Sequence, residues 1–449
     1  MTFSVEISNV VKNYKNFETA FLPHNIIIPL KLEDDTSYTP CVKAGDLVEE
    51  GQVIAVNSKK VNLHSSLPGK VIDIIPCYCS NGKQYFGIKI EFGGKFSYTG
   101  KIIKEFQAQE IVPILVADKL ISYGIFNTFN LAKIQNLGLQ IKEAKKYENL
   151  IVRLFDEDNY RYTDFLIAKF FMDKLMIAAK TLASAISAQG IIFAFNNKSE
   201  NKEALLKLHD EKVHFIGMNI KRYPCGTERE IMSAYIRNQS IKKSDKLKIS
   251  KKDLYIDAST LYEVYKAINK DMPQMSRPVF IYGNCLQASA ILDVKIGTTI
   301  KDIINQIGGF TKEPKIIVIN GLISGSRVQS LDTPITKEVK SLTFLSKEKK
   351  TDQNIFNCIN CGNCRFICPV KISPDLIYNN VIYYKELTQN IALSSIKCTN
   401  CGLCNVNCPS RLPLCQTITY LKNKLLNDEE KNNSESKNNF AAFYPGKDF

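Results

Sequence analysis

The first hundred residues alternate short apolar stretches with turn residues. In the segment 45–54, Gly45 and Gly51 mark turns around alternating apolar and polar positions, and a second apolar stretch follows at 67–72. Alternation with a period of two between glycine turns predicts short strands joined as hairpins. We therefore expect residues 1–105 to form a small β-sandwich domain.

The pattern changes after residue 106. Short apolar runs lie at 111–116, 150–154, 191–195 and 213–216, and residues 162–187 show helical spacing. Short continuous apolar runs suit parallel strands that are buried on both faces. Residues 106–242 are thus predicted to form an α/β domain of the kind that holds nucleotides.

Two further domains, two lysine-rich stretches and a polar tail follow. A lysine- and serine-rich stretch at 242–252 is typical of a linker, and residues 253–346 mix strands with one clear helix near 299–307, ended by Gly308 and Gly309. A lysine-rich stretch at 347–350 precedes a cysteine-rich domain at 351–425, and the polar segment 427–449 predicts a disordered tail. The expected fold class is multidomain α/β plus α+β.

Composition adds few constraints. The chain has 449 residues with a net charge of +14, and its lysines are spread among asparagines, as on a solvated surface. We expect no nucleic-acid partner. No signal peptide opens the chain, and Lys180 and Gln189 interrupt the best candidate for a membrane span, residues 175–195. The protein should have no transmembrane segment of its own, and any membrane binding should be peripheral.

Cysteine supplies the strongest signal, because eight of the 14 cysteines form an internal repeat. Cys358-x2-Cys361-x2-Cys364-x3-Cys368-Pro369 recurs 40 residues later as Cys398-x2-Cys401-x2-Cys404-x3-Cys408-Pro409. This is the spacing of bacterial two-cluster ferredoxins, in which the fourth cysteine binds the other cluster. It predicts two [4Fe-4S] clusters. The ligands are Cys358, Cys361, Cys364 and Cys408 for the first, and Cys398, Cys401, Cys404 and Cys368 for the second.

The alternative is a pair of structural zinc sites. Such sites usually combine separated Cys-x2-Cys pairs or include histidine, and no histidine lies in this region. The spacing favours iron–sulfur clusters. The other cysteines, Cys41, Cys77, Cys79, Cys225, Cys285 and Cys415, are interpreted as small apolar residues.

The order of parts, from about Pro23 to Lys422, resembles the C subunit of the Rnf ion-translocating electron-transport complex. Four stretches carry the resemblance: 23–52, 222–231 (Arg-Tyr-Pro-Cys-Gly-Thr-Glu-Arg-Glu-Ile), 294–304 and 408–414. The resemblance implies a barrel-sandwich hybrid module, a Rossmann-like domain similar to the complex I flavin subunit, an SLBB-type β-grasp domain and a helical two-cluster ferredoxin domain. It also implies FMN and NADH as cofactors, membrane subunits and a ferredoxin-like protein as partners, and a place on the cytoplasmic face of the membrane.

The chain departs from this family at its nucleotide loop. The family has a glycine-rich segment where this sequence reads Leu120-Ile121-Ser122-Tyr123-Gly124-Ile125-Phe126-Asn127-Thr128-Phe129-Asn130. Side chains then occupy the space of the phosphates, so FMN and NADH should bind weakly or not at all. The family's Gly-Ala-Glu-Cys-Glu-Pro turn corresponds to residues 154–159, which we interpret as a solvated acidic turn.

Three hypotheses for function follow. The first is an electron-transfer iron–sulfur subunit of an Rnf-type complex that couples ferredoxin and NAD redox chemistry to ion translocation. The second is a soluble flavin-dependent reductase similar to cobalamin reductases, which would need an intact nucleotide loop. The third is a non-catalytic scaffold whose clusters are structural.

Overall fold

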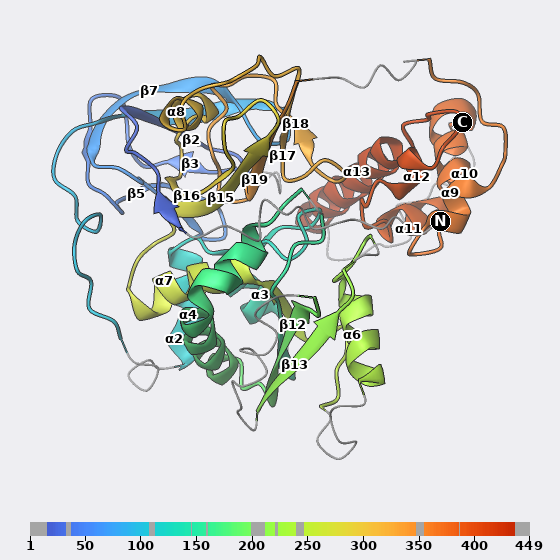
Figure 1. Cartoon of the computed structure of the whole chain (residues 1–449), viewed down its shortest axis with the longest axis horizontal. Coiled ribbons are helices and arrows are strands. Elements are labelled where there is room, and N and C mark those ends of the chain that lie inside the picture. Colours follow the sequence, from blue (N-terminus) through green and yellow to red (C-terminus); the bar gives the residue numbers. More distant parts are fainter. Residues whose placement is uncertain are drawn as a thin grey trace. The chain divides into compact units, whose positions relative to one another are not determined.

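The computed structural model divides the chain into two compact units, which lie within residues 2–348 and 349–449 (Figure 1). The residues that it describes are 16–32, 37–106, 113–144, 146–158, 160–198, 212–220, 223–238, 247–346, 354–385 and 387–435.

The first unit begins with two small antiparallel sheets. One has the order β2 (Asn25–Pro29), β8 (Gln84–Phe92), β7 (Gly69–Tyr78) and β4 (Leu47–Val48), and the other joins β3 (Thr39–Pro40), β5 (Val53–Val56) and β6 (Asn62–His64). Alternate residues such as Ile26, Ile28, Ile88 and Ile90 point into a shared core. The predicted β-sandwich hairpins are present, because the period-two pattern matches the two faces of each strand.

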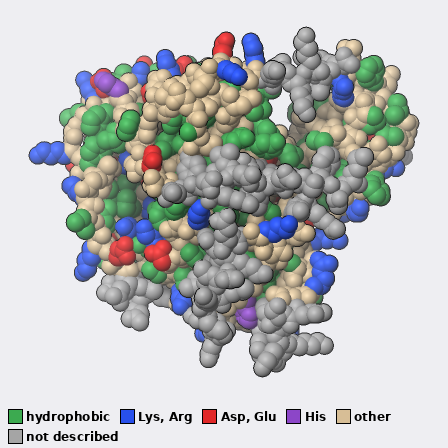
Figure 2. All heavy atoms as spheres, viewed as in Figure 1, with side chains coloured by type: hydrophobic (Ala, Val, Ile, Leu, Met, Phe, Trp, Pro, Cys, Tyr) green, Lys and Arg blue, Asp and Glu red, His purple; other side chains and the backbone are tan. Residues whose placement is uncertain are grey.

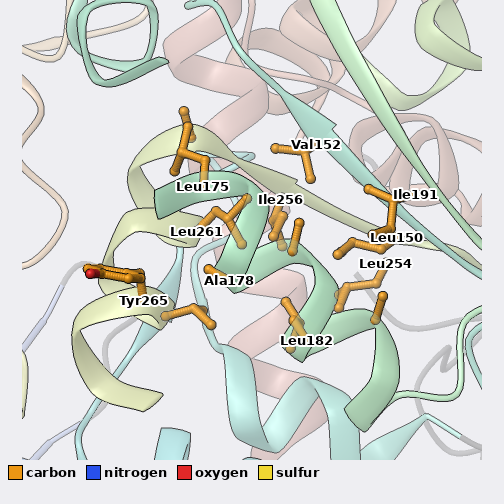
Figure 3. Packing of buried hydrophobic residues seen from close by; sticks show 14 of the residues in the cluster. Leu150, Val152, Leu175, Ala178, Leu182, Ile191, Leu254, Ile256, Leu261 and Tyr265 are labelled. Atoms are coloured by element: carbon orange, nitrogen blue, oxygen red, sulfur yellow. The ribbon is translucent and has the colours of Figure 1, made fainter. Parts of the chain in front are cut away.

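A four-stranded parallel sheet follows, in the order β13 (Val213–Met218), β12 (Gly190–Asn196), β11 (Asn149–Arg153) and β14 (Leu254–Asp257). Helices α4 (Thr163–Ala185) and α7 (Ala258–Asn269) pack against it. Figure 3 shows Leu175, Ala178 and Leu182 of α4 facing residues of the strands and of α7. The strands predicted at 150–154, 191–195 and 213–216 and the helix predicted at 162–187 are confirmed.

Two predictions in this layer are wrong. The run 111–116, predicted as a strand, lies in helix α2 (Pro113–Ser122) from residue 113, and residues 111–112 lie outside the described residues. A short apolar run cannot distinguish a buried strand from a buried helix. The predicted domain start at 253 is also wrong, since β14 pairs with β11 and α7 packs on α4, so residues 254–269 complete the α/β layer.

The third sheet of the unit is mixed, in the order β1 (Glu18–Thr19), β16 (Ala290–Lys295), β15 (Ser276–Gly283), β19 (Ser341–Leu345), β17 (Ile316–Ile319) and β18 (Ser326–Arg327). Helix α8 (Ile300–Gln306) covers it, capped by the Thr299 side chain and followed by Gly308 and Gly309 at positive φ. The helix near 299–307 is confirmed. Strand β1 corrects the boundary of the first predicted domain, because it pairs with β16 rather than with the N-terminal sheets.

The remaining elements of the first unit are shorter. They are β9 (Phe126–Asn127), β10 (Gln135–Asn136), α3 (Leu137–Glu143) and α6 (Glu228–Arg237).

The second unit is helical. It contains α9 (Asn363–Ile367), α10 (Pro374–Asn379), η3 (Asn380–Tyr384), α11 (Gln389–Ile396), α12 (Leu403–Val406) and α13 (Leu414–Glu435). Helix α13 runs past residue 427, where the disordered tail was predicted to begin, because extending an existing helix costs far less than starting one. Residues 436–449 lie outside the described residues.

Surface features agree with the composition. Figure 2 shows Lys and Arg side chains scattered over the visible face rather than gathered into one patch. Within the described ranges, no helix combines the length and the apolar character needed to cross a bilayer.

Candidate metal centre

The two cysteine motifs share one backbone shape. Residues 40 positions apart have matching positive φ angles: Asn360 and Asn400 (53° and 55°), Gly362 and Gly402 (72° and 71°), and Lys371 and Arg411 (56° and 55°). Positive φ is uncommon outside glycine. Each glycine also directly precedes a short helix, α9 or α12. The sequence repeat is therefore a structural repeat.

Four of the predicted ligands line one cavity. They are Cys358, Cys361, Cys364 and Cys408. The backbone N–H of Phe356 donates to the carbonyl of Ser410 at 3.1 Å, which holds the entry to the first motif beside the exit from the second. The structure thus brings together the set predicted for the first cluster, including its one cysteine from the other motif.

The other four predicted ligands are Cys368, Cys398, Cys401 and Cys404, of which Cys404 packs in an apolar cluster with Cys364 and Cys408. Cys368 and Cys398 pack in one apolar cluster that includes Ile377 and Ile418. The charge of Cys368 contributes to the raised pKa of Cys401. The charge of Cys401 contributes in the same way to the raised pKa of Cys398 and of Cys404. The first motif therefore contributes Cys368 to the neighbourhood of the second.

Burial controls the ionisation of these thiols. It raises the pKa of Cys364 to about 11, with a further contribution from the nearby Asp375 carboxylate, and raises the pKa of Cys401 to about 11. Since metals bind the thiolate, a metal must displace these protons when it binds.

An ion pair borders the first site. Arg365 Nε donates to Asp375 Oδ1 at 2.7 Å, and Arg365 Nη2 donates to Asp375 Oδ2 at 2.6 Å. Burial alone would raise the pKa of Asp375, but the hydrogen bonds and charge of Arg365 lower it below its usual value. Asp375 lines the first cavity, so this site carries a fixed carboxylate beside its thiols.

A further cysteine of this unit lies beside the second motif. Cys415, interpreted from the sequence as a small apolar residue, packs in the same apolar cluster as Cys404, and its thiol interacts electrostatically with those of Cys398 and Cys404. The interaction with Cys415, and burial after it, raises the pKa of Cys398 and of Cys404. The cysteine motif does not include Cys415, so its place beside the second motif was not predicted. The sequence feature that could have indicated it is the internal repeat, because Cys415 stands 40 residues after Asp375.

The donor set suits iron–sulfur clusters. Each iron corner of a four-iron cluster takes one thiolate, and four thiols surround the first cavity. No histidine occurs in residues 349–449. Across the part of the chain that the structure describes, no three His, Cys, Asp or Glu side chains converge on a position for a single metal ion.

The region predicted to have lost its nucleotide loop is filled by protein. Phe126 and Phe129 are buried, and Tyr123 packs against the α/β core. Gly124 has a φ of +64°, and a Cβ placed there would lie 2.3 Å from the Lys337 Nζ. Lys337 donates from that nitrogen to the Gly124 carbonyl at 2.9 Å. A lysine and aromatic rings thus cover the one remaining glycine.

The carboxyl edge of the parallel sheet is also occupied. Arg153, at the end of β11, is fully buried with its guanidinium 4.3 Å from the centre of the Phe129 ring. It donates to the carbonyls of Phe129 at 2.8 Å and Gly226 at 3.1 Å. Ligands of α/β sheets bind at this edge. Here side chains occupy it.

The acidic turn at 154–159 is not solvated, contrary to our interpretation, although Asn159 lies outside the described residues. Asp156 is buried 3.3 Å from Arg161, and Asp158 accepts a hydrogen bond from the Ile323 backbone N–H at 3.0 Å. The reason is long-range, since the loop that begins at Gly321 folds onto Asp158. The turn ties the α/β layer to the third sheet.

Comparison with known proteins agrees with the resemblance drawn from the sequence. Residues 8–95 match the family described as the RnfC barrel sandwich hybrid domain. The chain is 26% identical over 384 residues to the C subunit of the proton-translocating ferredoxin:NAD(+) oxidoreductase complex of Clostridium ljungdahlii, covering 84% of this chain and 82% of the relative. It is 24% identical to the Na(+)-translocating counterpart of Acetobacterium woodii, covering 78% and 80%.

A third relative is the C subunit of the ion-translocating oxidoreductase complex of Rhodobacter capsulatus, 26% identical over 91% of this chain and 79% of its own length. Among solved structures, an air-oxidized NAD+-reducing [NiFe]-hydrogenase matches with a TM-score of 0.44 and 11% identity, covering 71% of this chain and 64% of that one. The barrel-sandwich hybrid domain and the resemblance to Rnf C subunits over most of the chain are confirmed.

Proposed function

We propose that this chain, which resembles Rnf C subunits over most of its length, is an electron-transfer iron–sulfur subunit of a membrane-associated complex that couples ferredoxin and NAD redox chemistry to ion translocation. The observation that carries the proposal is the structural repeat of two cysteine motifs, in which thiols from both motifs line the first cavity. The names of the relatives support the type of complex.

The eight motif cysteines are the proposed ligands. Cys358, Cys361, Cys364 and Cys408 would hold one [4Fe-4S] cluster, and Cys368, Cys398, Cys401 and Cys404 the other. When bound, such clusters accept and donate single electrons. No proton-transfer residue is needed for that role, and the chain acts as a subunit rather than as a complete enzyme.

The surrounding residues would tune both sites. Leu412 and Leu414 line the first cavity, and Ile372 and Ile377 pack with Cys368 and Cys398 at the second. These side chains exclude water and lower the local dielectric. The backbone N–H of Asn400 donates to the Cys398 sulfur at 3.4 Å, a contact of the kind that shifts cluster potentials.

The first site lies near the surface of its unit. Cys361 is exposed, and Ile359, which also lines the cavity, is 65% exposed. A partner could therefore approach this site closely. We propose that a ferredoxin-like iron–sulfur protein exchanges electrons here, with the chain bound peripherally to membrane subunits at the cytoplasmic face.

The filled nucleotide region disfavours a soluble flavin-dependent reductase. Such an enzyme needs backbone amides open to a phosphate, whereas Lys337 covers Gly124 and Arg153 occupies the edge of the sheet. FMN and NADH are therefore not proposed as tightly bound cofactors of the isolated chain.

Metal analysis with a redox titration tests the proposal. Protein purified without oxygen should contain about eight irons per chain and show two reversible one-electron steps. Stoichiometric zinc in place of iron would refute the cluster assignment. Eight irons without reversible reduction would instead support the scaffold hypothesis.

A further inference from the structure

The second motif has a neighbouring cysteine that the ferredoxin spacing does not include. Cys415 lies in the first turn of α13, seven residues after Cys408. Its side chain packs in the same apolar cluster as Cys404, and its thiol interacts electrostatically with those of Cys398 and Cys404. Five cysteines therefore gather where a four-iron cluster needs four.

Local contacts hold Cys415 in this position. Its backbone N–H donates to Asn405 Oδ1 at 2.7 Å, and Asn405 lies in α12 directly after Cys404. The side chain packs in the apolar cluster that contains Cys404 and Leu414. The first turn of α13 is thus fixed against the helix that carries one of the proposed ligands.

The internal repeat gives a direct comparison with the first site. Forty residues before Cys415 stands Asp375, and 40 residues before Asn405 stands Arg365. Asp375 lines the first cavity and lies close to Cys364, the counterpart of Cys404. The two repeat-related positions, Asp375 and Cys415, therefore each lie beside proposed cysteine ligands. The first carries a carboxylate and the second a thiol.

The two residues differ in what they offer iron. Asp375 is a hard oxygen donor already engaged by two hydrogen bonds from Arg365. Cys415 is a soft sulfur donor, the kind that iron–sulfur clusters select, and its hydrogen bond to Asn405 is made by the backbone N–H rather than by the thiol.

We propose that Cys415 is a reserve ligand of the second cluster site, able to take the iron position of Cys398 or Cys404 when that thiol is lost. The inference rests on the proposed function, since it presumes the clusters. In the absence of Cys398 or Cys404, the Cys415 S–H bond breaks and one iron–sulfur bond forms at the open iron; the proton passes to solvent, so no electron is gained or lost. At the first site a carboxylate, Asp375, stands in the equivalent place.

Iron content and electron paramagnetic resonance of four variants test the proposal. Cys404→Ala should keep about eight irons, with shifted g-values for the second cluster, because Cys415 supplies the missing thiolate. The double variant Cys404→Ala/Cys415→Ala should fall to about four irons. The matched control is Cys364→Ala, the repeat-related change at the first site, which should also fall to about four. Cys415→Ala alone should keep both clusters, since the four motif cysteines remain.

Three outcomes would overturn the inference. The first is loss of the second cluster in Cys404→Ala to the same extent as in the double variant. The second is loss of that cluster in Cys415→Ala, which would make Cys415 an obligatory ligand. The third is retention of eight irons in all four variants. Circular dichroism verifies that each variant folds. If Cys404→Ala or its double variant does not fold, Cys404→Ser and Cys404→Ser/Cys415→Ala take their place. Absence of iron from the unmodified chain would refute the proposed function instead.

Discussion

Cys408 belongs to the second motif in sequence but to the first cavity in space. Cys408→Ala should therefore remove the first cluster, with loss of about four irons, and preserve the signal of the second. Cys368→Ala is the matched reciprocal variant and should weaken the second cluster. Resonance spectra of the two variants check the assignment, and a loss of the second signal in Cys408→Ala would contradict it.

The four cysteines around the first cavity could be grouped from the sequence, because the ferredoxin spacing assigns the fourth cysteine of each motif to the other site. The five-thiol neighbourhood at the second site could not, since it depends on where α13 begins relative to α12. The burial of Asp156 and Asp158 was missed for a similar reason. An acidic turn is normally solvated, and only the folded chain brings Arg161 and the Ile323 backbone within reach.

Lys337 should make stability depend on pH. Burial lowers the pKa of its ammonium group from 10.5 to about 7. Between these two pKa values the unfolded chain binds the proton and the folded chain does not. The free energy of unfolding should therefore rise with pH from 7 to 10.5, and Lys337 should destabilise the folded chain as the pH falls through this window.

Urea unfolding of the full chain at about pH 7.5 and about pH 9.5 tests this, because both values lie inside the window where the two states differ in bound protons. Lys337→Met removes the titrating group, so its stability should rise less between the two pH values than that of the unmodified chain. Lys301→Met, at an exposed position, is the control and should follow the unmodified chain. Equal pH dependence in Lys337→Met and the unmodified chain would show that Lys337 titrates normally.

At the scale of elements, a buried ion pair network joins parts that sequence patterns assign to separate domains. Lys340, just before β19, pairs with Asp164 at 2.7 Å at the start of α4 and also with Asp257 at the end of β14, and all three side chains are fully buried. Burial alone would raise the pKa of Asp257, but the charge of Lys340 holds it well below its usual value. The third sheet and the α/β layer are therefore coupled energetically.

Lys340→Met should destabilise the first unit by about 3–5 kcal/mol, because it leaves two buried carboxylates without their cation. Lys301→Met serves again as the exposed control and should change stability by less than about 0.5 kcal/mol. Thermal and urea unfolding measure both. A change below about 1 kcal/mol in Lys340→Met would mean that water or protonation compensates the carboxylates, and would contradict the proposed coupling.

Strongly periodic elements were predictable and short ones were not. The spacing in α4 and the apolar runs of β11, β12 and β13 persist over enough residues to define a face. Strand β14 has only four residues, and its place is set by pairing with β11 about a hundred positions earlier in the chain. Pattern alone carries no information about such a partner.

At the scale of the whole molecule, the order of parts predicts the type of protein better than it predicts the boundaries. The N-terminal module was identified from its hairpins and is confirmed by the match of residues 8–95. Strand β1 nevertheless pairs with β16, and β14 with β11, so chain segments cross the expected limits within the compact unit 2–348. A domain inferred from sequence is one continuous range of residues, whereas a sheet can contain strands from distant positions in the chain.

Whether NADH can reduce the chain directly also depends on the whole molecule, because that reaction needs a nucleotide site. A pyrophosphate binds where backbone amides are open at a turn or helix start. In the first unit Lys337 covers Gly124, Phe126 and Phe129 are buried, and Arg153 fills the carboxyl edge of the sheet. Opening this region would expose apolar rings and break the hydrogen bonds of two buried basic side chains, Lys337 and Arg153.

Isolated, iron-loaded protein should therefore show no micromolar binding of NADH or FMN by calorimetry, and NADH should not reduce its clusters on mixing. Dithionite is the positive control and should bleach the visible absorption of the clusters, which shows that they can accept electrons. A reduced ferredoxin should do the same if the proposed partner is correct. Micromolar binding of either nucleotide, or rapid reduction by NADH alone, would show that the side chains move aside and that the chain retains its own nucleotide site. Since Lys337 and Phe126 fill this region, NADH that bound there would have to displace them, and protection of residues 126–129 from hydrogen exchange would then fall.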